Sequence, residues 1–211
     1  PNNPYLLNLN GMAHQFLDDH PSAINFFNLA IKNEEREAVQ LLIKNKHIDK
    51  TLKTNPGGYT PLELAISYGF EDIVELLLNC YDISLTVLQP SALDGGGGGG
   101  WTIVHHASSV GDKANNVKIL QLVLKSVLEC CREDTSKSNG ASFINKQDND
   151  GDTAYDLASV QNYQEILNVL MPYRKKYQAS LSAEEQQAGK KPSVYYKLVE
   201  TYEKLAKDKE L

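Results

Sequence analysis

The sequence predicts an all-α protein, a solenoid of about four stacked helix–turn–helix repeats. Two observations predict this class. A threonine followed by a short apolar helical segment occurs three times, at residues 60–65, 102–107 and 153–158. A second apolar segment follows each copy after a turn, at residues 73–78, 119–124 and 166–171. Because the paired segments recur in the same order, we expect each pair to bury its apolar side against the next pair.

The N-terminal elements are the least regular. Residues 1–20 show helical spacing around Met12 and Phe16, and we expect them to form an N-terminal helical cap. Residues 22–47 form a degenerate first repeat that lacks the threonine–proline start. Terminal repeats of a solenoid are expected to be atypical because one of their faces meets water.

The second repeat, near residues 55–80, is the clearest copy. Thr60 is placed to cap the first helix with its hydroxyl, and Pro61 suits the first helical position, where a missing N–H is harmless. Ala65 is small where two helices approach closely. Gly69 can adopt the positive φ that reverses the chain between the helices.

The third and fourth repeats, near residues 99–126 and 148–173, follow longer connections. Residues 95–100 are six consecutive glycines, a composition typical of a flexible connection. This run is either natural or engineered, and both origins stay open. Residues 129–139 are polar and predict a mobile loop. Insertions in solenoids often lie on the binding face, so both connections are candidate functional elaborations.

After the repeats, residues 172–211 predict a helical extension. Val194, Leu198, Tyr202 and Leu205 fall on one face of a helix in this segment. We interpret it as a cap that closes the last repeat. The start of another domain and a docking helix for a partner are the alternatives.

These motifs resemble the ankyrin repeat, a β-turn and two helices with the signature Thr-Pro-Leu-His-x-Ala and a period of about 33 residues. Residues 60–65 fill the signature with Glu63 in the position of its histidine, whereas residues 102–107 place His105 there. The resemblance covers about residues 20–171. It implies an ankyrin solenoid with β-turn or hairpin loops. It also implies a non-enzymatic module that binds a partner protein through its loop tips and concave face.

The resemblance carries over a set of partner-binding positions at the tips and in the groove. They are Tyr59, Ser67, Tyr68, Trp101, Ser109, Asn149, Asp150, Asp152 and Gln161, with Gly57, Val110 and Val160 beside them. The three aromatic residues of this set suit a binding hot spot, and their alternative role is packing on their own loops. Acidic residues between Asp148 and Asp156 favour a basic partner surface.

No catalytic, cofactor or metal site is expected. His105 occupies the signature position, where the resemblance implies a hydrogen bond that supports the turn, and His106 is predicted to be an exposed surface histidine. The three cysteines, Cys80, Cys130 and Cys131, fit no zinc pattern and are expected to be thiols of a reducing compartment. The protein is therefore not expected to be an enzyme.

Composition narrows the classes of partner. The chain has 211 residues and a net charge of −6, which argues against a nucleic-acid surface. No apolar run approaches the ~18 residues of a membrane span. We expect a monomer in the cytoplasm, or in the host cytosol or nucleus if it is an effector. The first residue is Pro1 rather than Met, and we expect a piece of a longer protein.

Two functional classes fit the sequence. The first is an interaction module, such as the host-targeting array of a bacterial effector, which the Asn-, Lys- and Ile-rich residues 30–46 favour. The second is the substrate-recruiting part of a larger enzyme or transcription regulator whose active domain lies outside this chain.

Overall fold

The computed structural model describes residues 29–32, 34, 36–44, 59–79, 100–133 and 140–181. Within these ranges the regular structure is helical, and no strand occurs. The helices of at least five residues are α3 (Arg36–Lys44), α4 (Pro61–Tyr68), α5 (Glu71–Leu78), α7 (Ile103–Ser109), α8 (Ala114–Glu133), α9 (Gly140–Ile144), α10 (Ala154–Val160) and α11 (Gln164–Ser180). The predicted N-terminal cap, Gly57, Cys80 and residues 182–211 lie outside the described residues.

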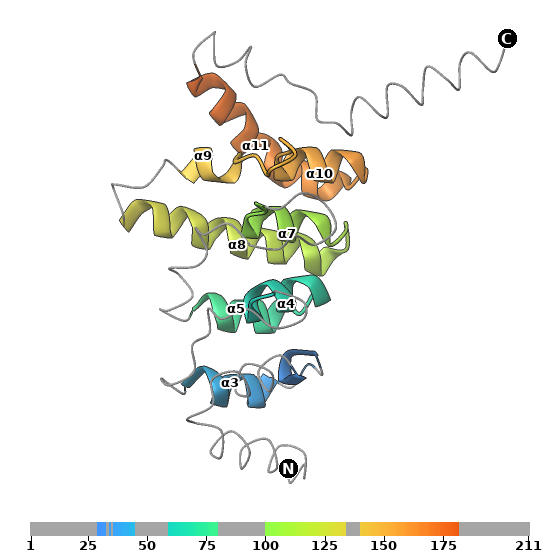
Figure 1. Ribbon diagram of the computed structural model, residues 1–211, viewed down its shortest axis with the longest axis vertical. Helices are drawn as coiled ribbons and strands as arrows, with labels where there is room; N and C mark the ends of the chain where they lie inside the picture. The colour runs from blue at the N-terminus through green and yellow to red at the C-terminus, as the bar shows by residue number, and fades with distance from the viewer. Residues whose placement is uncertain are drawn as a thin grey trace, which may run out of the picture.

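The helices stack in layers along one axis (Figure 1). The first helix of each repeat packs on the first helix of the next, so that α4, α7 and α10 form an inner row. The second helices α3, α5, α8 and α11 form an outer row in the same way. The structure therefore confirms the predicted all-α solenoid.

Each helix of the inner row begins with the same cap. A threonine in extended conformation precedes the helix, and the side chain three residues later bonds back to the threonine N–H in a capping box. The three pairs are Thr60 with Glu63, Thr102 with His105, and Thr153 with Asp156. The cap explains why the threonines mark the repeats in the sequence.

Two of the turns between helices use one backbone geometry. Gly69 has a φ of 76° and Asn162 a φ of 56°, and each donates its N–H to the carbonyl three residues back. The left-handed conformation was expected of Gly69. Asn162 was not identified from the sequence, although asparagine is the residue that most often replaces glycine there.

The core lies between the two rows and runs through the whole stack. Ala65 and Ile66 of α4 are fully buried, as are Ala107 of α7 and Ala158 of α10. The outer row contributes larger side chains to the same cluster, including Ile73, Leu77, Ile119, Leu120, Ile166 and Leu170. The small side chains Ala65, Ala107 and Ala158 of the inner row allow the layers to approach closely.

Two outer helices are longer than predicted. Helix α8 continues to Glu133, so the prediction of a mobile loop is wrong for residues 129–133. Its side chains Leu124, Val127, Leu128 and Cys131 continue a helical stripe that packs on the core. Helix α11 continues through Pro172 to Ser180, so the segment predicted as a C-terminal extension begins inside this helix. The short helix α9 packs against both of them.

Candidate functional site

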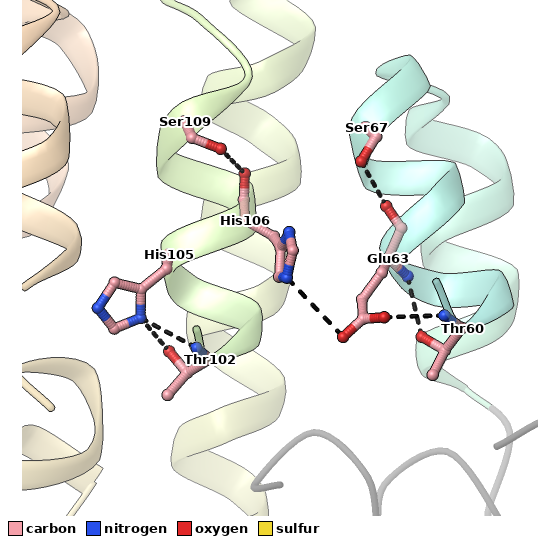
Figure 2. Close-up of polar contacts among 7 residues, drawn as sticks. All are labelled: Thr60, Glu63, Ser67, Thr102, His105, His106 and Ser109. Carbon is pink, nitrogen blue, oxygen red and sulfur yellow. Dashed lines mark hydrogen bonds and ion pairs between the residues drawn. The ribbon is translucent and has the colours of Figure 1, made fainter. Parts of the chain in front are cut away.

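The capping side chains of the inner row reach across the boundaries between repeats. One carboxylate oxygen of Glu63, Oε2, accepts the Thr60 N–H at 2.8 Å. The other, Oε1, lies 3.8 Å from Nε2 of His106 on the next inner helix (Figure 2). Glu63 therefore caps its own helix and faces the neighbouring repeat with the same side chain.

The prediction that His106 is an exposed surface histidine is wrong, because its side chain is only 6% exposed. The stacking of α7 on α4 places it against Glu63, whose side chain is 8% exposed. Residues 63 and 106 come from different repeats, so no local sequence pattern joins them. The only sequence feature that pointed to this contact was the glutamate at position 63, where the signature has a histidine.

His105 has the supporting role that the resemblance implied. Its Nδ1 accepts the Thr102 N–H at 3.0 Å and lies 2.8 Å from the Thr102 hydroxyl, as Figure 2 shows. Its Nε2 lies 3.1 Å from the carbonyl oxygen of Asp152 in the next repeat. These contacts fit a neutral ring with the hydrogen on Nε2. Burial lowers the pKa of His105 below its ordinary value of 6.5 and keeps the ring neutral.

The acidic loop before α10 is held together by its own carboxylates. Oδ1 of Asp148 accepts the N–H groups of Asp150 and Asp152 at 3.0 and 2.9 Å. Asp156 caps Thr153 and pairs with Arg174 of α11 at 2.8 Å. Asp148 and Asp152 are buried, whereas Asn149 and Asp150 are exposed. Most of the charge on which a basic partner was predicted is thus used within the fold.

Two of the three predicted aromatic contacts pack around His106. The ring centroid of Trp101 lies 5.1 Å from that of His106, and the centroid of Tyr59 lies 6.1 Å from it, both edge-on. Trp101 and Tyr59 are half-buried. They therefore support the boundary between α4 and α7, and any contact with a partner would be an additional role.

Tyr68 lies differently. It is 45% exposed at the end of α4, where its ring stacks on Phe70 at a centroid distance of 5.6 Å. Within the part of the chain that the structure describes, Tyr68 and Leu29 are the large hydrophobic residues exposed to this degree. Of the predicted aromatic contacts, Tyr68 is the one most available to a partner.

The remaining predicted residues of the inner row come together in one strip. We define the inner-row strip as the seventh and eighth residues after each threonine, namely Ser67, Tyr68, Ser109, Val110, Val160 and Gln161. Ser67, Tyr68 and Gln161 are exposed, and the other members are half-buried. Because α4, α7 and α10 are neighbours in the row, these positions lie on successive repeats.

Charged residues near the starts of the outer helices connect neighbouring repeats, and the sequence did not predict these contacts. Arg36 of α3 pairs with Asp72 of α5 at 2.6 Å, and Lys118 of α8 pairs with Glu71 at 3.3 Å. Asp112 accepts the N–H groups of Glu165 and Ile166 at 3.1 and 3.0 Å, and so caps α11 from the preceding repeat.

A pocket lies on the outer row. It has a volume of about 450 Å³ and separates α8 from α11, with apolar walls that include Leu124, Leu128, Val169 and Tyr173. Gln121 and Lys125 also line it.

Among the residues that the structure describes, no three of His, Cys, Asp and Glu are grouped to hold a metal ion. No helix in those same residues is both long and apolar enough to cross a membrane.

The stacked helix pairs and their shared caps define a helical repeat protein. Residues 5–89 match the family model of ankyrin repeats in three copies. This match supports an ankyrin-repeat protein, and repeats of this kind generally serve as protein-interaction modules. The pairs α7/α8 and α10/α11 lie beyond the matched residues, and their first helices share the threonine cap of α4. None of the curated proteins matches the chain.

Proposed function

We propose that this chain binds another protein through the inner-row strip and the adjacent loop tips. Tyr68 is the observation that carries the proposal. An exposed aromatic side chain on the inner row offers a large area that a partner can bury with little loss of conformational freedom. Phe70 stacks beneath it and fixes its ring.

The residues proposed to contact the partner differ in exposure. Ser67, Tyr68, Asn149, Asp150 and Gln161 are exposed and can meet a partner directly. Ser109 is half-buried, and it would contact the partner through its hydroxyl oxygen. The half-buried Tyr59 and Trp101 and the buried Asp152 contribute mainly by holding the surface in shape.

We also propose a biological context for this binding. The Asn-, Lys- and Ile-rich residues 30–46 support a host-targeting array of a bacterial effector. The partner would then be a host protein, and the array would act in the host cytosol or nucleus.

Capture of proteins from a eukaryotic lysate tests the proposal. The wild-type chain is compared with a Tyr68→Ala/Gln161→Ala variant, which changes two exposed side chains of the strip. Gln121→Ala, on the exposed side of α8, is the matched control. Tyr59 and Trp101 are left unchanged because their removal would disturb the packing around His106.

A protein captured by the wild type and the control, but lost from the double variant, supports the proposal. Capture that survives the double variant but fails with Gln121→Ala would move the site to the outer pocket. Capture that survives all variants, or no capture at all, would contradict binding through the inner row.

A further inference from the structure

We infer that the inner-row strip selects an extended, uncharged segment of its partner. The inference rests on the proposed function and names the chemistry of the partner at the same site. It differs from the basic partner that the acidic loop suggested, because the strip and the loop carry different chemistry.

The inner-row strip is uncharged. The acidic and histidine side chains of the inner helices are Glu63, His105, His106 and Asp156, and each has a partner within the stack. The six members of the strip carry no formal charge. A lysine or aspartate of a partner placed on the strip would lose water without gaining a counter-ion there, which is unfavourable.

The two serine hydroxyls of the strip act as donors within their own helices. The Ser67 hydroxyl donates to the Glu63 carbonyl at 2.9 Å, and the Ser109 hydroxyl donates to the His106 carbonyl at 3.0 Å (Figure 2). Each hydroxyl has a single hydrogen, so its oxygen is left to accept. These two positions therefore suit N–H donors of a partner.

Spacing and donor supply favour an extended chain. Packed helices lie about 8–10 Å apart, and an extended chain rises about 3.3 Å per residue, so about every third residue would meet a repeat. The backbone N–H groups of a helix are used within the helix, apart from those of its first turn. Those of an extended segment are available to the serine oxygens. A segment of about seven to nine residues would cross α4, α7 and α10.

Apolar contact completes the match. Tyr68 offers an exposed ring at one end of the strip, and Val110 and Val160 are half-buried on the next two repeats. The strip therefore suits a segment with an apolar or aromatic side chain where it meets α4. Small neutral residues would follow over the other two helices.

Random linear peptides of about twelve residues, displayed on phage, are the probe, since they exceed the length that the strip spans. The full chain is immobilised, and the enriched peptides are sequenced and synthesised. We expect the binding stretch to lack charged residues. We also expect Kd to change less than about twofold between ~50 and ~500 mM salt, because salt screens mainly charge–charge attraction.

Gln161→Glu is the sharpest variant because it adds a charge to the strip with almost no change in shape. We expect it to weaken peptide binding about tenfold, or more. Gln121→Glu makes the same change on α8 and should leave binding unaltered. Peptide binding that tolerates Gln161→Glu would overturn the inference.

Two other results would also overturn it. One is an enriched set with a recurring charged residue whose affinity falls tenfold or more at high salt. The other is no enrichment at all. Lysate capture that is lost with Tyr68→Ala/Gln161→Ala would still support the proposed function in either case, so the two failures can be told apart.

Discussion

Glu63 and His106 face each other across the boundary between the second and third repeats, with Oε1 and Nε2 3.8 Å apart and both side chains buried. Glu63 holds the Thr60 N–H with its other oxygen. His105 repeats this arrangement one layer on, since it caps Thr102 and reaches the Asp152 carbonyl. The residue that caps each of these two helices thus also joins its repeat to the next.

Glu63→Gln should therefore weaken the boundary while keeping the cap. The amide oxygen of glutamine can still accept the Thr60 N–H, but the negative charge opposite His106 is lost. We expect the free energy of unfolding, measured in urea, to fall by about 1 kcal/mol. Glu63→Ala also removes the cap and should lower it by about 1 kcal/mol more.

Glu75→Gln provides the control, because Glu75 is exposed on α5. Its effect should stay within about 0.5 kcal/mol. A Glu63→Gln protein as stable as the wild type would show that the contact with His106 adds nothing to the stability of the stack.

His105 should make stability depend on pH. Burial lowers its pKa in the folded state below the ordinary 6.5, so the unfolded chain takes up the proton first as the pH falls. The stabilisation is complete above the ordinary pKa and declines as the pH falls towards the folded pKa. Between about pH 7.5 and 5.5, the wild type should lose up to about 1 kcal/mol more than His105→Gln.

Unfolding in urea at several pH values measures this difference. The glutamine variant is chosen because its side chain can still accept the Thr102 N–H. Parallel pH profiles for the two proteins would mean that protonation of His105 does not oppose folding.

The elements that the sequence predicted are those set by local chemistry. Threonine caps, Pro61 and Gly69 act within a few residues of their own positions, so α4 and the starts of α7 and α10 could be located. The burial of His106 could not be predicted in this way, because it depends on Glu63, which lies 43 residues away in the sequence. The continuation of α8 was hidden by its polar end, although Cys131 keeps the helical spacing from Leu124.

Ala65→Glu should disrupt the second repeat. Ala65 is fully buried between the inner helices, so a glutamate there would be buried without a counter-ion. We expect a loss of about 3 kcal/mol or more in the free energy of unfolding, seen as a lower midpoint in a thermal melt. Ser67→Glu is the matched control, because Ser67 is exposed on the same helix. Equal melting temperatures for the wild type and Ala65→Glu would refute this alignment of the repeat.

Asp112→Ala should loosen α11 from a distance of one repeat. Tyr163 precedes this helix and offers no side-chain cap, and both oxygens of Asp112 accept its first N–H groups. We expect a loss of about 1 kcal/mol on urea unfolding and faster amide exchange at the start of α11. Asp72→Ala, which breaks an exposed ion pair with Arg36, should cost less than about 1 kcal/mol. An Asp112→Ala protein with unchanged exchange at α11 would contradict the capping role.

Gly69 and Asn162 should respond in opposite ways to substitution. Both have positive φ, and both make the same backbone bonds to the preceding inner helix. Gly69→Ala places a Cβ in this strained conformation, 3.0 Å from the Asn116 side-chain oxygen, and should cost about 1–2 kcal/mol. Asn162→Gly relieves the strain of a side chain at positive φ and should stabilise the protein by a few tenths of a kcal/mol, up to about 0.5. Thermal melts of the two variants measure both changes, and a gain from Gly69→Ala or a clear loss from Asn162→Gly would show that the two turns are not equivalent.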